Sequence, residues 1–351
     1  MLAYILSFVL SLTIMSFAMK CKAKAFSLFC HILAILPPVL LLAFRGDECG
    51  TDTANYTRMF ESIDTDGFAS LFLATRVEML FALLMYFISK MNFSLFSFFF
   101  ICGVLTVAPV YYGSIKLKRI LNPIFLMALF YLMFYQYAFN IVRQSIAMSL
   151  LFLAVVYLIE NHKKRSLMLG VFSMMFHTVA VVYIVVFVIY IFSERITAKF
   201  IIKYGILLAI AFYLLQNVLS GHMESIEDYM DRGGDSMQLS YFVEMLLNFL
   251  IVLFVWRNNH TILRRFFILV SGVVLSVILI SPIAPYIFRV ANCIDILMLL
   301  YIPIVLKNIN NKNLYSMYLS FALFFWWFVF IFNRSGGTYP YVLSPNFNLI
   351  Y

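Results

Sequence analysis

Long apolar runs separated by short polar breaks fill the sequence almost from end to end. A helix that crosses the hydrocarbon core of a bilayer needs about 20 mostly apolar residues, and runs near that length recur along the whole chain. The pattern therefore predicts an all-α, polytopic integral membrane protein with about 11 to 13 helices, some of them short or re-entrant. The predicted helices cover residues 2–19, 26–44, 77–89, 93–112, 121–138, 142–159, 166–176, 178–192, 200–219, 239–256, 266–282, 291–306 and 314–332.

Lysines and arginines gather in the breaks between these runs and predict the orientation of the chain. By the positive-inside rule such clusters lie on the cytoplasmic side. The other breaks then face outside, chiefly two outer loops at 45–76 and 220–238 and a polar outer tail at 333–351. Because no polar stretch is long enough for a separate soluble domain, we predict one membrane domain over residues 1–351. The clusters are Lys20/Lys22/Lys24, Lys116/Lys118/Arg119, Lys163/Lys164/Arg165, Arg257/Arg264/Arg265 and Lys307/Lys312.

Two segments do not fit a simple series of crossings. The chain needs an odd number of crossings between the outer loop 45–76 and the cytoplasmic cluster at 116–119, but two apolar runs lie between them. Because the run 77–89 is short for a span, we predict that it is a half-helix or an interfacial segment. Residues 166–192 have to return to the side on which they start if the cluster Arg257/Arg264/Arg265 is to be cytoplasmic. A pair of short helices that turns at His177 would achieve this. Irregular backbone at membrane depth is tolerated only where protein or a water-filled cavity surrounds it, so both places indicate a cavity.

The composition agrees with a membrane protein and excludes several other classes. The chain is 64% hydrophobic and only 12% charged, with a mean hydropathy of +0.97. The formal net charge of +9 does not indicate nucleic-acid binding, because the basic residues lie in clusters that orient spans. The 5 cysteines form no CxxC pair, and no histidine stands at metal-ligand spacing, so the sequence predicts no disulfide framework, no metal site and no cofactor.

The stretch "RGDECGTDTANY" at 45–56 places charges directly after an apolar run. Ionisable groups at the rim of a membrane bundle often mark a site. Here Arg45 and Asp52 could meet over a pocket beside the aromatic ring of Tyr56, on a loop that Gly46 and Gly50 allow to turn tightly. The alternative is that Arg45 reaches the lipid headgroups and the acids form a solvated rim.

The stretch "NIVRQ" at 140–144 places an arginine between two apolar runs, at the predicted outer surface. Arg143 suits bidentate binding of phosphate, and Asn140 and Gln144 are candidates for sugar or acceptor contacts. The alternative is a helix-end anchor, although outer arginines run against the usual bias.

Two further titratable residues are candidates for general acid–base chemistry. His177 lies deep in apolar sequence, where its surroundings can bring its pKa into the working range; the alternative is a hydrogen bond between helices. Glu78 starts the short third run and is either a general base or an interfacial charge paired with Arg76.

Near the end of the chain, Arg289 repeats the theme of an isolated arginine at an outer helix end. Pro282 and Pro285 precede this arginine and break a helix there. Tyr286 is a candidate for stacking on a sugar ring. Asp295, further along the same run, is an alternative partner that would neutralise Arg289.

Together these motifs resemble the EpsG-like branch of the Wzy-type polysaccharide polymerases. The resemblance spans nearly the whole chain and rests on "RGDECGTDTANY" at 45–56, Glu78 opening a short helix, "NIVRQSIA" at 140–147, "FH" at 176–177, "FRVANC" at 288–293, "YIPIVLK" at 301–307 and "TYPYVL" at 338–343. It implies a multi-pass glycosyltransferase of the C type in the bacterial inner (cytoplasmic) membrane. Such an enzyme works at the outer or periplasmic face without metal or nucleotide.

The resemblance also implies substrates, partners and roles. Donor and acceptor would be oligosaccharide repeat units on undecaprenyl diphosphate, joined into O-antigen or exopolysaccharide, and membrane lipids and a chain-length regulator protein are expected partners. Breaking a sugar–diphosphate bond develops negative charge, so arginines are expected to bind the diphosphate. We expect Arg45, Arg143 and Arg289 to bind it, Asp52, Glu78 or His177 to act as the base, and Tyr56, Asn140, Gln144 and Tyr286 to contact sugar or acceptor.

Two other functions would use a similar chain. A flippase for lipid-linked oligosaccharides should show repeat-related halves with central charges, whereas this sequence shows no repeat and its charges gather at the rim. A ligase that joins polymer to the lipid A core would use the same donor, but its usual very long outer loop is not obvious here.

Overall fold

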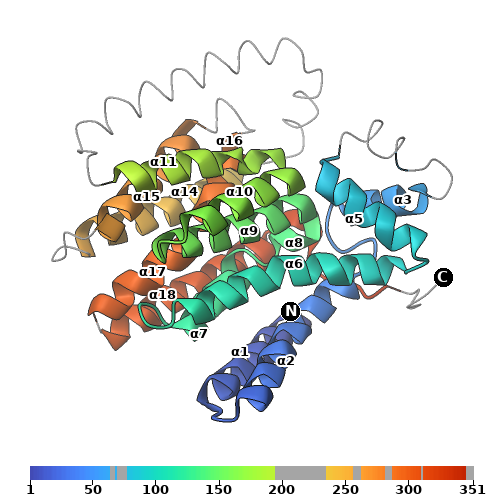
Figure 1. The fold of residues 1–351 in the computed structure, drawn as a ribbon, viewed down its shortest axis with the longest axis horizontal. Coiled ribbons are helices and arrows are strands. Elements are labelled where there is room, and N and C mark those ends of the chain that lie inside the picture. The colour runs from blue at the N-terminus through green and yellow to red at the C-terminus, as the bar shows by residue number, and fades with distance from the viewer. Residues whose placement is uncertain are drawn as a thin grey trace, which may run out of the picture. The chain divides into compact units, whose positions relative to one another are not determined.

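The fold of this chain is described from a computed structural model (Figure 1). The structure describes residues 1–63, 68, 77–193, 235–255, 262–280, 287–309 and 311–344. The predicted helix 200–219, most of the outer loop 220–238, the end of the outer loop 45–76 and Tyr286 lie outside the described residues.

Helices make up almost all of the described chain, and the prediction of an all-α polytopic membrane protein is confirmed. The described residues contain one isolated β-bridge, between Arg45 and Leu343, and no strand. The α-helices are α1 (Leu2–Lys20), α2 (Lys24–Ala43), α3 (Thr53–Glu61), α5 (Met79–Lys90), α6 (Leu95–Lys116), α7 (Pro123–Met133), α8 (Tyr137–Asn140), α9 (Val142–Ile159), α10 (Lys163–Phe176), α11 (Val182–Phe192), α14 (Asp235–Leu250), α15 (Ile262–Ile280), α16 (Ile287–Asp295), α17 (Met298–Ile309) and α18 (Lys312–Trp326). Shorter 3-10 turns cover Thr178–Val181 and Ser335–Gly337, and π-helical turns cover Ile251–Val255 and Trp327–Phe332.

Seven helical segments among the described residues are long and apolar enough to cross a membrane. Most coincide with the apolar runs of the sequence, because hydrophobicity sustained over 18 residues or more is the strongest signal for a span. These segments are Leu2–Lys20, Lys24–Ala43, Leu95–Lys116, Val142–Ile159, Ile262–Leu279, Ile287–Ile309 and Lys312–Phe332.

The helix boundaries follow from local side-chain chemistry at several breaks. Asn122 caps α7: its side-chain oxygen accepts hydrogen bonds from the N–H groups of Ile124 and Phe125, and Pro123 occupies the first helical position. Asn92 and Asn161 follow α5 and α9 with positive φ angles of 57° and 67°, the left-handed conformation that ends many helices.

Some boundaries differ from the prediction. Helix α3 lies within the predicted outer loop 45–76, for which no helix was predicted, and the run 121–138 is α7 followed by a break and the single turn α8. The run 291–306 is divided between α16 and α17. At His177 the α-helix ends, as predicted, because this residue has extended backbone angles (φ −158°, ψ 126°). Helix α5, with 12 residues, is indeed shorter than a span.

The described chain forms two compact units. Unit 1 contains Met1–Ala180 and Asn310–Tyr351, and unit 2 contains Val181–Ile309. The prediction of one membrane domain over 1–351 stays a prediction. In unit 2, α15 and α17 share an aromatic core in which Phe267 contacts both Phe266 and Tyr301.

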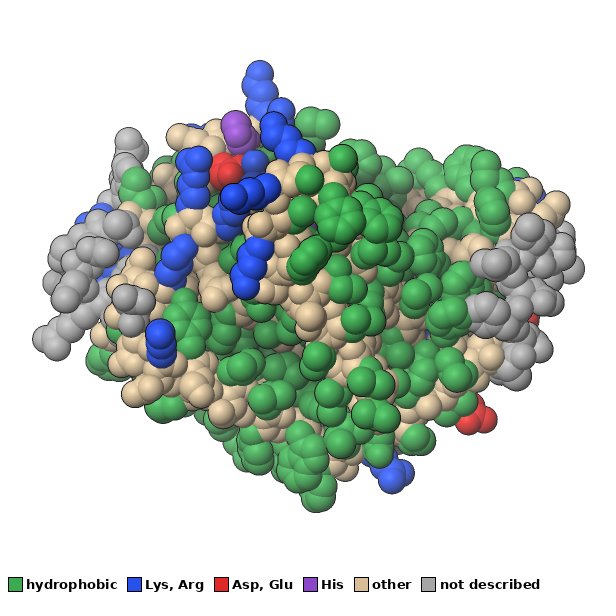
Figure 2. Space-filling view, turned by 90° about the horizontal axis from the view of Figure 1, so that it is seen from below, with side chains coloured by type: hydrophobic (Ala, Val, Ile, Leu, Met, Phe, Trp, Pro, Cys, Tyr) green, Lys and Arg blue, Asp and Glu red, His purple; other side chains and the backbone are tan. Residues whose placement is uncertain are grey.

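In unit 1, α9 is the central helix. It is 83% buried, and it packs against α6 and α10. Helices α6 and α9 both end at a basic surface, where Lys116 forms an ion pair with Glu160 and lies over the Tyr157 ring. Arg165 lies over the same ring, so the clusters at 116–119 and 163–165 meet, as expected for breaks on one side of a membrane. Figure 2 shows basic side chains gathered in one region beside extensive hydrophobic surface.

The contact between α6 and α9 depends on a glycine. A Cβ atom at Gly113 would lie 2.7 Å from Cε1 of the buried Phe152 ring. At Gly272 in α15, by contrast, a Cβ atom would lie 3.5 Å from its nearest neighbour, an ordinary contact. Glycine at position 113 therefore lets the two helices approach closely.

We expect Gly113→Ala to lower the free energy of unfolding by about 1–3 kcal/mol, because the added methyl group overpacks the α6–α9 contact. The matched variant Gly272→Ala should be neutral or stabilising, since alanine favours a helix over glycine. Thermal unfolding of both variants in detergent micelles measures the difference. A Gly113→Ala protein as stable as the wild type would contradict this description of the packing.

Candidate active site

The end of unit 1 opposite the basic surface carries the predicted site residues. Helix α2 ends there and α6 and α9 begin there, so the site and the clusters at 116–119 and 163–165 lie at opposite ends of α6 and α9. Helix α9 has 18 residues, about 27 Å of helix, close to the thickness of a hydrocarbon core.

The loop after α2 is fixed to two other parts of the chain. The irregular segment between α7 and α9 receives three contacts from it. The Arg45 guanidinium donates to the carbonyl of Ala138 (2.7 Å), and the Thr51 N–H donates to the side chain of Asn140 (2.7 Å). The Thr53 hydroxyl is shared between the carbonyl of Cys49 (2.7 Å) and that of Phe139 (3.2 Å). These bonds satisfy polar groups that a break inside an apolar bundle leaves open.

The segment 335–344 forms the other support of this loop. The N–H groups of Gly46 and Gly50 donate to the carbonyls of Val342 (2.8 Å) and Gly337 (2.9 Å). The buried Tyr4 hydroxyl on α1 donates to the carbonyl of Thr338 (2.6 Å). The loop after α2 therefore lies between the break at 134–141 and the end of the described chain.

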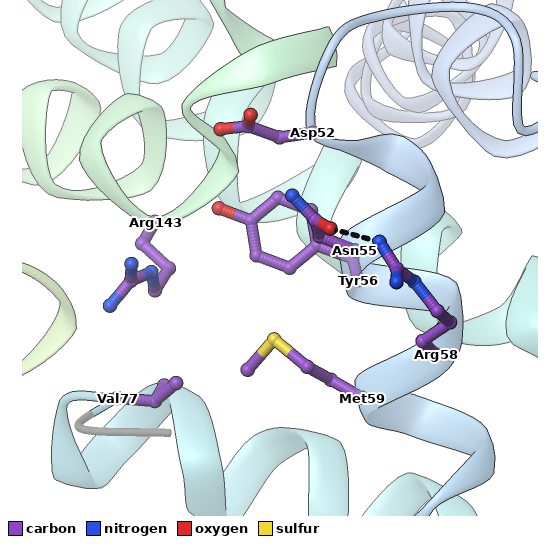
Figure 3. Close-up of a pocket in the computed structure, with 7 residues that line it drawn as sticks. All are labelled: Asp52, Asn55, Tyr56, Arg58, Met59, Val77 and Arg143. Atoms are coloured by element: carbon purple, nitrogen blue, oxygen red, sulfur yellow. Dashed lines mark hydrogen bonds between the residues drawn. The ribbon is translucent and has the colours of Figure 1, made fainter. Parts of the chain in front are cut away.

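A pocket of about 400 Å³ opens beside α3 (Figure 3). In this view Arg143 and Arg58 lie on opposite sides, with Asp52 above and Met59 below. The guanidinium of Arg58 donates to the Asn55 side chain (2.5 Å). The pocket is lined by Asp52, Asn55, Tyr56, Arg58, Met59, Val77 and Arg143.

Glu78 joins three elements next to this pocket. Its Oε2 atom accepts from Nη1 of Arg143 at 2.5 Å, and its Oε1 atom accepts from Nδ1 of His177 at 2.6 Å and from the N–H of Thr178 at 3.1 Å. A carboxylate only accepts hydrogen bonds, so Nδ1 of His177 carries the hydrogen. The Arg143 guanidinium also donates to the Tyr56 hydroxyl. The arginine is therefore held by an acid and a phenol while 28% of its side chain stays exposed.

The electrostatics keep Glu78 ionised. Burial by itself raises the pKa of the Glu78 carboxyl, but the hydrogen bond from His177 and the charge of Arg143 outweigh burial and lower that pKa to about 2. Burial likewise raises the pKa of the Tyr56 hydroxyl, which stays protonated. A carboxylate with so low a pKa is a poor proton acceptor at neutral pH.

A comparison of the sequence with protein families finds one that matches most of the chain. The model of the EpsG family matches residues 28–343, which include the loop after α2, the break at 134–141 and His177. The chain belongs to the EpsG family. Members of this family are Wzy-like polysaccharide polymerases, so the predicted resemblance is confirmed. No curated protein and no solved structure matches the chain.

The other predicted site residues of this EpsG-family chain lie away from the pocket lining. Arg45 is only 3% exposed, and its guanidinium stacks on the Phe99 ring with 3.9 Å to the ring centroid. Gln144 is 1% exposed. The Asn140 side-chain oxygen is taken by Thr51. The roles predicted for these residues remain predictions.

Arg289 lies in unit 2, on α16. Asp295, the partner suggested for it, is hydrogen-bonded to Glu244 of α14, and both carboxyl groups are buried. Among the described residues no group of three or more His, Cys, Asp or Glu side chains could hold a metal ion. The expectation of a reaction without metal or cofactor stays a prediction.

Sequence reasoning missed two contributors to the site of this EpsG-family protein. Arg58 lines the pocket because α3 turns it there, and the helical spacing of the buried Tyr56 and Phe60 was the signal for that helix. The segment 335–344 supports the loop through backbone hydrogen bonds, which leave no trace in a pattern of side chains.

The Glu78 contacts predict a defined pH dependence. A pKa lowered from 4.5 to about 2 stabilises the folded state above pH 4.5, and that contribution is lost as the pH falls through about 2. We expect Glu78→Gln to be less stable than the wild type at pH 7 by about 3 kcal/mol, with the gap closing between about pH 4.5 and 2.

Thermal unfolding in detergent between pH 2 and 7 tests this. The exposed acid Glu48 in the same EpsG-family chain gives the control Glu48→Gln, which should follow the wild type. A constant gap between Glu78→Gln and the wild type would show that the Glu78 contacts do not carry the pH dependence.

Proposed function

We propose that this EpsG-family polymerase joins oligosaccharide repeat units carried on undecaprenyl diphosphate into a surface polysaccharide. The growing chain moves from one lipid carrier onto a hydroxyl group of the next unit, at the outer face of the bacterial inner (cytoplasmic) membrane. The observation that carries the proposal is Arg143, a cation held by Glu78 and Tyr56 with its free side toward a pocket.

Arg143 suits the leaving group of this reaction. Cleaving the bond between the sugar and the diphosphate leaves negative charge on the diphosphate oxygen, and a guanidinium fixed before the reaction stabilises that charge without reorganising. Arg58, on the opposite side of the same pocket, supplies a second cation for the second phosphate. Arg45 and Arg289 are weaker candidates, because neither lines the described pocket.

Asp52 is the base that this geometry favours. It lines the pocket with Arg143, whereas Glu78 is committed to Arg143 and His177 and has a pKa of about 2. In the proposed step the Asp52 carboxylate takes the proton of the acceptor hydroxyl. The oxygen then bonds to the anomeric carbon of the donor, and the bond to the lipid diphosphate breaks with its electron pair.

The orientation is supported by the two ends of α6 and α9. The basic clusters at 116–119 and 163–165 lie at the ends where these helices finish, and such clusters mark the cytoplasm. The pocket lies at the other ends, where lipid-linked units and the expected chain-length regulator would be met.

We expect Arg143→Ala to lower polymerisation about 10²–10³-fold, because the leaving diphosphate loses its fixed counter-charge. A deletion strain complemented with each variant gives the measurement, as the ladder of surface polysaccharide on a gel. A product of core plus one unit, without longer chains, is the expected result. Arg143→Lys should restore little, since an ammonium group lacks the bidentate geometry.

The exposed Arg119 at the basic surface provides the control Arg119→Ala, which should give the full ladder. Loss of every unit from the core in the deletion strain would indicate a flippase or ligase instead. An unchanged ladder with Arg143→Ala in a normally expressed protein would overturn the proposed role of this arginine.

Asp52→Asn should lower polymerisation about 10²–10⁴-fold, because the amide cannot accept the proton of the attacking hydroxyl. The initial rate on a lipid-linked repeat unit in proteoliposomes measures the effect, with Glu48→Gln in the same loop as the control. If Asp52→Asn retains the wild-type rate, the base is another residue.

A further inference from the structure

The side chain of Asn140 occupies a junction between three segments of unit 1. Its oxygen accepts from the N–H of Thr51 at 2.7 Å and from the Thr51 hydroxyl at 3.2 Å. The same Thr51 N–H also points at the carbonyl of Gly336, at 3.3 Å. We call Thr51, Asn140 and Gly336 the Asn140 junction.

The junction is too tightly packed for any side chain at Gly336. A Cβ atom there would lie 2.2 Å from the Asn140 side-chain nitrogen, which would have to move. The neighbouring Gly337 has a similar backbone, with φ of 61° against 72°, but a Cβ atom there would lie 3.8 Å from its nearest neighbour, Thr51. Of these two neighbouring glycines, only Gly336 therefore lies against Asn140.

Two of the three residues in the junction are close in sequence to a residue of the proposed reaction. Thr51 precedes Asp52 and its hydroxyl donates to the Asp52 carboxylate at 3.5 Å, while Asn140 lies three residues before Arg143. The loop that carries Asp52 and the break that leads into α9 meet at this amide. The amide therefore lies between the segments that carry the acid and the arginine of the pocket.

We propose that Gly336 is a positioning residue of the active site, which acts through Asn140 to hold Asp52 and Arg143 in register. The inference rests on the proposed function. Asn140 is then a positioning residue, and the end of the described chain belongs to the catalytic apparatus without contacting the substrate.

The pair Gly336→Ala and Gly337→Ala tests the proposal. Both substitutions place alanine at a left-handed backbone position, so both should lower the unfolding temperature, Gly336→Ala by more because of its clash with Asn140. Only Gly336→Ala displaces Asn140. We expect its turnover number on an undecaprenyl-diphosphate repeat unit in proteoliposomes to fall about tenfold below that of Gly337→Ala, with little change in KM. Equal turnover numbers would overturn the proposal.

Asn140→Ala provides a second test that does not depend on the folding of Gly336→Ala. Positioning predicts a lower turnover number, whereas direct sugar binding by Asn140 predicts a raised KM and an unchanged turnover number, which would refute the proposal. In the double variant, Gly336→Ala should add nothing to the loss caused by Asn140→Ala; multiplied effects would show that Gly336 acts elsewhere.

The wild type and Arg143→Ala, measured in the same assay, distinguish failure of the proposed function from failure of the positioning role. A wild type that does not extend lipid-linked units would refute the proposed function and the inference with it. An active wild type, an inactive Arg143→Ala and equal glycine variants would refute the positioning role alone.

Discussion

An arginine held at the end of an apolar bundle needs a fixed counter-charge, and Glu78 supplies it to Arg143. The same carboxylate accepts from His177 and from the backbone of the next residue, so one acid ties the start of α5, the start of α9 and the end of α10 together. Without it, Arg143 would lose its acidic partner, and Nδ1 of His177 and the N–H of Thr178 would lose their acceptor. The geometry of the pocket follows from this ion pair, because Arg143 is one of its walls.

The break at 134–141 makes this arrangement possible and also has to be stabilised. A continuous helix from α7 into α9 would leave no carbonyl groups for Arg45 and Thr53 to bind, and no Asn140 side chain facing the loop after α2. Irregular backbone at this depth persists only where other groups satisfy it. The buried Arg45 is best understood in this way, as a donor to the break that is also covered by the Phe99 ring.

The polar residues of the site fall into two groups, those bonded to neighbouring groups and those that line the pocket. Glu78, His177 and Asn140 are engaged by neighbouring groups and hold positions, whereas Asp52, Arg58 and Arg143 line open space. A glycosyl transfer between lipid-linked sugars needs both kinds of group. Preorganised charge lowers the barrier only if the surrounding contacts keep it in place before the substrate arrives.

Hydrophobic runs and isolated charges alone predicted the all-α membrane class, most of the spans and the interruption at His177, and they marked Arg143, Glu78 and Asp52 as candidate site residues. These features are local. About 20 apolar residues make a span, and a charged residue between two spans lies at the membrane surface or in the bundle interior, because exposing it to lipid is costly. Which charges meet was decided only by the tertiary structure. Glu78 is 65 residues from Arg143 and 99 from His177, and Gly336 reaches Asn140 through packing and backbone bonds that no periodicity records. The burial of Arg45 likewise could not be read from the sequence, because burial depends on contacts that only the folded chain assembles.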